Sequence, residues 1–98
     1  MSKPKIYIFK TPRCAACAPF AAKVAKELTE ADLFDEVELL ETMISNDMPN
    51  KFGIKIETVP TTVVTDASGK VVMTYTGVVD VKHIIDDVEK LLDESGVR

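Results

Sequence analysis

The sequence predicts one α/β domain over residues 1–98, with the element order β-α-β-α-β-β-α. Short apolar runs rich in β-branched and aromatic residues alternate with segments that are apolar at the helical period. The first strand, helix and second strand form a unit that predicts a parallel pair with a right-handed crossover. A glycine-containing turn between the last two runs predicts an antiparallel hairpin.

The first strand is expected at Lys5–Phe9, a nearly continuous apolar run that is typical of a central strand covered on both faces. Thr11-Pro12-Arg13 interrupts the run. A helix follows from about Cys14 to Thr29, because its apolar residues recur every three or four positions. Pro19 would then fall in the second turn, where it lacks the N–H that bonds back to Ala15, so we expect a kink there.

The middle of the chain predicts a second strand at Glu36–Leu40 and a short helix at Asn46–Phe52. Either Asn46 or Ser45 is expected to cap this short helix, and Gly53 is expected to end it.

The last part of the chain begins with a third strand at Thr58–Thr65. The turn Asp66–Gly69 connects it to an antiparallel strand at Val71–Thr76, because glycine accepts the positive φ that such turns require.

A final amphipathic helix is expected after Asp80, its N-cap, and before Gly96. Its apolar stripe consists of Val81, Ile84, Ile85, Val88, Leu91 and Leu92.

The composition is ordinary for a globular chain, with 46% hydrophobic residues, a net charge of −4 and a pI near 4.9. This acidic balance gives no reason to expect a nucleic-acid partner. No apolar run reaches the ~18 residues of a membrane span, and no signal-peptide core follows the first residues. We therefore expect a monomer in the cytoplasm, where a cysteine pair is more often catalytic or metal-binding than structural.

The strongest candidate for a reactive site is Cys14-Ala15-Ala16-Cys17, which contains both cysteines of the chain. Residues three apart on a helix lie on one face, so the two sulfur atoms are expected to meet. Cys14 would lie at the helix N-terminus, where the helix dipole and Arg13 lower the pKa of a thiol below its free value of about 8.5. Cys17, one turn deeper, should keep a higher pKa, and the two alanines should leave both thiols accessible. This arrangement predicts a dithiol that opens and closes a disulfide.

The chain resembles the thioredoxin/glutaredoxin superfamily over nearly its whole length. The resemblance rests on a strand followed by Cys14-Ala15-Ala16-Cys17, on Lys51-Phe52-Gly53-Ile54, on Thr58-Val59-Pro60-Thr61, on the hairpin and on Gly77. It implies a four-stranded mixed sheet flanked by three helices, with a cis Val59–Pro60 bond facing the dithiol.

The resemblance also implies a substrate-binding role for Arg13, Thr58, Val59 and Pro60. The Val59 backbone would pair with an extended segment of the substrate, by strand addition. Lys10, Gly77 and Asp80 are secondary candidates. Lys10, Arg13, Thr58-Val59-Pro60 and Asp80 could be partial equivalents of the glutathione-binding residues of glutaredoxins.

The chain departs from its best-known relatives in three ways. It has no tryptophan before the first cysteine, and Ala15-Ala16 replaces the usual residues between the cysteines. The buried acid that assists proton transfer in many thioredoxins would fall near Ile8, which cannot titrate.

The resulting hypothesis is a thiol–disulfide oxidoreductase that reduces disulfides in partner proteins. Cys14 attacks the partner disulfide as a thiolate, and Cys17 then resolves the mixed disulfide. No bound cofactor is expected; electrons would come from a thioredoxin reductase/NADPH system or from glutathione.

Two alternatives remain open. The cysteine pair could bind a soft metal such as Cu(I) or zinc, as in heavy-metal chaperones that place such a pair at the start of a helix. A structural zinc needs four ligands, however, and the one further soft candidate is His83, on the polar face of the last helix. The domain could also be an interaction module whose cysteines are idle.

Overall fold

A computed structural model describes residues 3–44 and 48–94 of the chain. Its elements follow the predicted order. They are β1 (Lys5–Lys10), α1 (Cys17–Glu30), β2 (Glu38–Met43), α2 (Met48–Phe52), β3 (Thr61–Thr65), β4 (Val71–Thr76) and α3 (Val81–Glu94).

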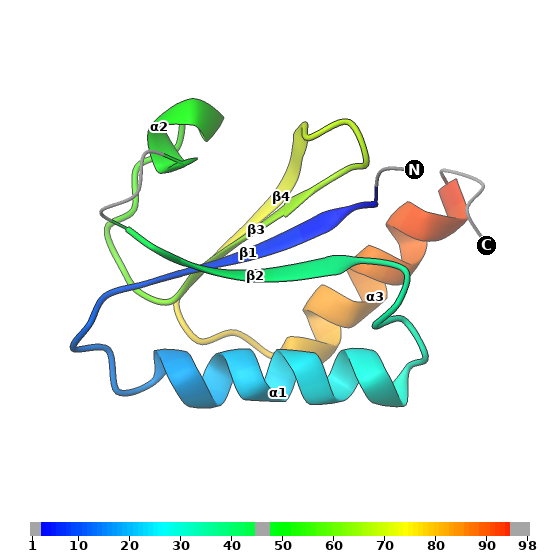
Figure 1. Ribbon diagram of the computed structural model, residues 1–98, viewed down its shortest axis with the longest axis horizontal. Helices are drawn as coiled ribbons and strands as arrows, with labels where there is room; N and C mark the ends of the chain where they lie inside the picture. The colour runs from blue at the N-terminus through cyan, green and yellow to red at the C-terminus, as the bar shows by residue number, and fades with distance from the viewer. Residues whose placement is uncertain (1–2, 45–47, 95–98) are drawn as a thin grey trace.

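The four strands form one mixed sheet in the order β2-β1-β3-β4. β1 pairs with β2 in parallel and with β3 antiparallel, and β3 pairs antiparallel with β4. Helices α1 and α3 lie on one side of the sheet and α2 on the other (Figure 1). The predicted mixed sheet flanked by three helices is therefore confirmed.

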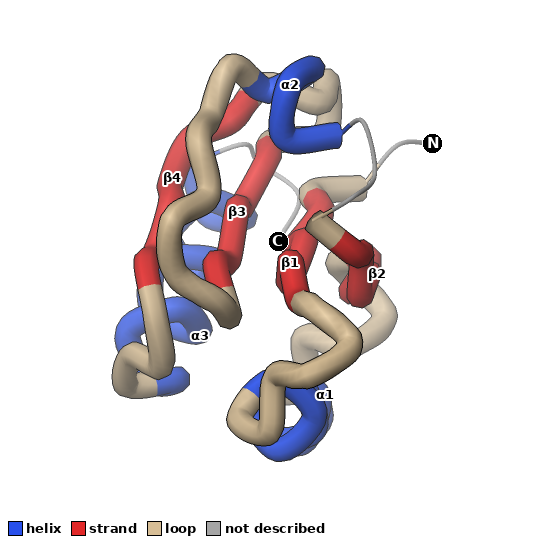
Figure 2. The backbone as a smooth tube through the Cα atoms, turned by 90° about the vertical axis from the view of Figure 1, so that its left-hand side faces the viewer, coloured by secondary structure: helices blue, strands red, loops and turns tan. Residues whose placement is uncertain are grey.

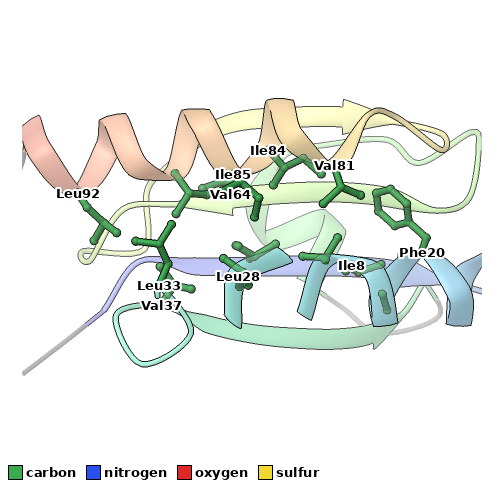
Figure 3. Packing of buried hydrophobic residues seen from close by; sticks show 14 residues of the cluster. Ile8, Phe20, Leu28, Leu33, Val37, Val64, Val81, Ile84, Ile85 and Leu92 are labelled. Atoms are coloured by element: carbon green, nitrogen blue, oxygen red, sulfur yellow. The ribbon is translucent and has the colours of Figure 1, made fainter. Parts of the chain in front are cut away.

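Two apolar clusters lie on the two faces of this sheet. The larger one joins Ile6 and Ile8 of β1 to the buried stripes of α1 and α3, and Figure 3 shows these side chains packed between the helices and the strands. The smaller one contains Tyr7 and Phe9 on the opposite face, with Phe52 of α2 against them. Because β1 buries residues of both faces, it is the central strand that its continuous apolar run predicted.

Helix α1 begins three residues later than expected, at Cys17 instead of Cys14. This start places Pro19 in the first turn, where a helical N–H has no partner within the helix, so the proline removes no hydrogen bond there. The first intrahelical bond runs from the Phe20 N–H to the Ala16 carbonyl, 3.1 Å away. The predicted position of Pro19 in the second turn of the helix is therefore wrong.

Two strands also differ from the predicted bounds. β2 lies two to three residues later than Glu36–Leu40, because Glu36 still belongs to a turn in which its N–H donates to the Leu33 carbonyl. β3 begins after Pro60 instead of at Thr58, because proline has no N–H to give to the ladder. The expected caps of the short helix, Ser45 and Asn46, and Gly96 lie outside the described residues.

Two other local predictions are confirmed. In the hairpin turn, Asp66 Oδ1 accepts hydrogen bonds from the N–H groups of Ser68 and Lys70, and Gly69 has φ of +93°. At the start of α3, Asp80 Oδ1 accepts the Lys82 N–H at 3.0 Å, the geometry of an N-cap.

Among residues 3–44 and 48–94, no helix has the length and apolar composition that crossing a membrane requires.

Candidate functional site

The two cysteines are joined by a disulfide at the point where the β1–α1 loop enters α1. Cys14 lies in the loop, where its N–H donates to the Thr11 carbonyl at 3.2 Å. Its own carbonyl accepts the Cys17 N–H at 3.4 Å, and Cys17 is the first residue of α1. The turn that these bonds close holds the two Cα atoms 5.4 Å apart.

The two sulfur-bearing residues differ in exposure. Cys17 is 1% exposed, because it continues the buried stripe of α1 one turn before Phe20. Cys14 is half-buried, and its neighbours Arg13 and Ala15 are exposed. The expectation that both thiols are accessible is therefore wrong for Cys17. The expectation that Cys14 sits within the helix is also wrong, because α1 starts three residues after it.

The segment before β3 carries the predicted substrate-binding residues. The Val59–Pro60 peptide bond is cis, and Pro60 is buried. The Thr61 hydroxyl donates to the Thr58 carbonyl, and the Gly77 N–H donates to the Pro60 carbonyl at 2.8 Å. Neither the N–H nor the carbonyl of Val59 forms a hydrogen bond with another described residue. Within residues 3–44 and 48–94, both backbone groups of Val59 are therefore available to bond to another chain.

Three connections meet at one end of the sheet. They are the β1–α1 loop with the cysteines, the segment that enters β3, and the β4–α3 connection (left side of Figure 1). Figure 2 views the molecule from this end and shows the three connections in front of the strands. The Gly77–Pro60 hydrogen bond links two of them directly.

An apolar hollow of about 250 Å³ lies between the start of α1 and the β4–α3 connection. Val78, at its rim, is 65% exposed, which is unusual for a valine. The residues that line the hollow are Ala16, Pro19, Phe20, Lys23, Val78, Val79 and Val81. The hollow therefore adjoins the loop of the disulfide.

The prediction of site residues missed this hollow, because its walls come from two segments about 60 positions apart in sequence. The signal in the sequence was Val78-Val79, an apolar pair between Gly77 and the N-cap Asp80, where no regular element needs it.

The secondary candidates already have partners within the chain. Lys10 Nζ lies 3.3 Å from Glu41 Oε1 on β2, in a partly exposed ion pair. Asp80 caps α3. Gly77 has φ of +80°, a conformation that glycine adopts without strain.

The described residues contain no group of three or more His, Cys, Asp or Glu side chains that could hold a metal ion. His83 is exposed on α3.

No family model matches the chain, and no curated protein matches it in sequence.

Solved structures with a similar fold include three thioredoxin or thioredoxin-like proteins. An uncharacterized thioredoxin-like protein from Clostridium perfringens has a TM-score of 0.71 and 24% identity, with 92% of this chain and 71% of that chain covered. Thioredoxin O2 from Arabidopsis thaliana, in its oxidized state, has a TM-score of 0.68 and 22% identity over 92% of this chain and 76% of that chain. Thioredoxin 1 from Thermosipho africanus has a TM-score of 0.67 and 22% identity over 94% and 98%.

The chain therefore has the thioredoxin-like fold, which confirms the resemblance to this superfamily at the level of architecture.

Proposed function

We propose that this protein is a thiol–disulfide oxidoreductase that reduces disulfide bonds in partner proteins. The observation that carries the proposal is the Cys14–Cys17 disulfide, with one sulfur-bearing residue partly exposed and the other buried, at the sheet end where Val59 has unpaired backbone groups. The solved thioredoxins of similar fold support the same class of reaction.

The reaction begins with the reduced protein. The Cys14 thiolate attacks one sulfur of the partner disulfide, forms a mixed disulfide and expels the other partner sulfur as a thiolate, which takes a proton from water. Cys17 then loses its proton and attacks Cys14 Sγ, which expels the second partner thiolate. Two electrons pass to the partner, and the protein is left with the Cys14–Cys17 disulfide.

The difference in burial assigns the two roles. A partner protein can approach Cys14, which is half-buried, but not Cys17, which is 1% exposed. Cys17 can attack within the chain, because the turn holds the two Cα atoms 5.4 Å apart, within the usual range for a disulfide.

Two features of the site favour an extended, apolar segment as the substrate. The unpaired N–H and carbonyl of Val59 would bond to the backbone of such a segment. The hollow beside Val78 would take an apolar side chain next to the reacting disulfide. Arg13, exposed beside Cys14, would favour a partner that is acidic near its disulfide.

A protein reductase fits the site better than glutathione as the source of electrons. Two of the side chains expected to contribute to a glutathione site already have partners within the chain: Lys10 pairs with Glu41, and Asp80 caps α3. In this proposal the protein acts as a monomer in the cytoplasm, where its disulfide is continually returned to the dithiol.

The test is reduction of insulin disulfides by the purified protein, with NADPH and thioredoxin reductase in one assay and with glutathione and glutathione reductase in the other. Wild-type protein should turn over, and faster with thioredoxin reductase. Cys14→Ser should be inactive, whereas Ala18→Ser, which adds a hydroxyl at an exposed position of the same turn, should keep wild-type activity. A Cys14→Ser variant that still reduces insulin would disprove the proposal.

A further inference from the structure

Two buried hydroxyl groups have no hydrogen-bond partner among the described residues. The buried polar side chains in residues 3–44 and 48–94 are Thr61, Thr62 and Thr65, all on β3. The Thr61 hydroxyl donates to the Thr58 carbonyl, but those of Thr62 and Thr65 have no partner. Because the large majority of buried polar side-chain atoms in proteins are hydrogen-bonded, these two need an explanation.

Thr62 lies on the face of the sheet that α1 and α3 cover, at the end of β3 toward the β1–α1 loop. It is the register partner of Ile8, so the two side chains are on the same face. Ile8 and Phe20 belong to one packed cluster, where Figure 3 shows them close together. Cys17 precedes Phe20 by one turn on the same buried stripe. Thr62 is also two residues after Pro60, at the end of β3 where the three connections meet.

Thr65 provides the contrast. It is as deeply buried as Thr62, and its hydroxyl is also unpaired. It is the register partner of Lys5, at the opposite end of β1 from the cysteines and on the face of Tyr7. Thr65 therefore matches Thr62 in residue type and burial but not in its position relative to the disulfide.

Cys17 requires a stabilising donor once the disulfide is reduced. Burial disfavours a thiolate, and Cys17 must become one to resolve the mixed disulfide. The charged side chains nearest to it in sequence or at the same end of the sheet, Lys10, Arg13, Lys23 and Asp80, are all at least partly exposed. The titratable residue on the strand beside Thr62 is its register partner Tyr75, whose half-buried hydroxyl already donates to Asp87 of α3. On β1, the residue beside Thr62 is Ile8, which cannot titrate. Among the described residues of this face, the fully buried hydroxyl without a partner is that of Thr62.

We propose that the Thr62 hydroxyl donates a hydrogen bond to the Cys17 thiolate in the reduced protein. In the disulfide, Cys17 Sγ carries no charge to attract the donor, and the Thr62 hydroxyl has no partner among the described residues. The inference rests on the proposed function, because it assigns Thr62 to the step in which Cys17 attacks Cys14.

The test compares Thr62→Val, Thr62→Ser and Thr65→Val. In a Cys14→Ser background, Cys17 is the one remaining thiol, and the ultraviolet absorbance of its thiolate against pH gives its pKa. Thr62→Val should raise this pKa by about one unit, as expected for loss of one hydrogen bond to a charged group. Thr62→Ser should restore most of the shift, and Thr65→Val should leave the pKa unchanged.

A second readout uses the intact dithiol. At pH values below the pKa of Cys17, a rise of one unit lowers the thiolate fraction about tenfold but raises its nucleophilicity about threefold, so Thr62→Val should slow resolution of a mixed disulfide about threefold. Equal Cys17 pKa values in Thr62→Val and Thr65→Val would overturn the inference, even if wild-type protein reduces insulin. Wild-type protein that fails to reduce insulin would instead disprove the proposed function, and the pKa comparison would still be readable.

Discussion

The Cys14–Cys17 disulfide should make the folded protein more stable than its dithiol form, by an amount that follows from the size of the closed loop. The disulfide closes a loop of four residues, from a sequence separation of three. The loss of chain entropy in the unfolded state for this loop corresponds to about 1.9 kcal/mol at 25 °C. For a domain of this size, the midpoint of thermal unfolding should rise by roughly 10 °C.

The assay is thermal and urea unfolding, followed by circular dichroism, with and without an excess of a dithiol reductant. Cys14→Ser is the matched control: it cannot form the disulfide, and its stability should be the same under both conditions. Because folding and disulfide formation are thermodynamically linked, about 1.9 kcal/mol corresponds to an equilibrium constant for disulfide formation about 25-fold larger in the folded chain than in the urea-unfolded chain. Equilibration with glutathione under both conditions measures this ratio.

A dithiol form that unfolds at the same temperature as the disulfide form, or at a higher one, would refute this reasoning. It would mean that reduction stabilises the folded state by at least as much free energy as the disulfide contributes by restricting the unfolded chain.

Two further predictions concern α3. The Tyr75 hydroxyl donates to Asp87, and burial, followed by this hydrogen bond, raises the pKa of Tyr75. Because the pKa is higher in the folded state, this hydrogen-bonded tyrosine should contribute its full stabilisation below pH about 10 and lose it at higher pH. Above pH about 10, the free energy of unfolding should therefore fall more steeply with pH in wild-type protein than in Tyr75→Phe. Asp80→Ala should lower the free energy of unfolding by about 1 kcal/mol through loss of the N-cap of α3, whereas Asp86→Ala, exposed on the same helix, should change it by less than about 0.5 kcal/mol in urea unfolding.

Strong local patterns in the sequence predicted the elements well. The bounds of β4 agree with the predicted Val71–Thr76, because the turn at Asp66–Gly69 fixes where the second strand of the hairpin starts. The start of α3 follows from Asp80, whose side chain can cap the helix that its own backbone begins.

The start of α1 was harder to predict, because two signals conflict there. The cysteine spacing suggested a helix from Cys14, whereas Pro19 is harmless only in a first turn and therefore requires a later start. The helical periodicity of the apolar residues does predict that Cys17 is buried, because Cys17 lies three residues before Phe20 on the buried stripe of α1. Small residues at positions 15 and 16 do not make Cys17 accessible, because the helix directs the Cys17 side chain into the core.

The rest of the candidate site depends on contacts between distant segments. The unpaired backbone of Val59, the Gly77–Pro60 hydrogen bond and the hollow beside Val78 arise where three connections meet at one end of the sheet. No local pattern specifies how closely such connections approach one another. The sequence therefore identified the two cysteines as the candidate reactive residues but did not predict the surface around them.

The most direct test of the central claim is to trap the intermediate. Cys17→Ser, incubated with a disulfide-containing partner protein, should accumulate a covalent complex through Cys14 that mass spectrometry detects and that a reductant dissolves, while catalytic turnover is lost. A Cys17→Ser variant that forms no mixed disulfide, or that keeps full dithiol turnover, would contradict the assignment of Cys14 as nucleophile and Cys17 as the resolving thiol.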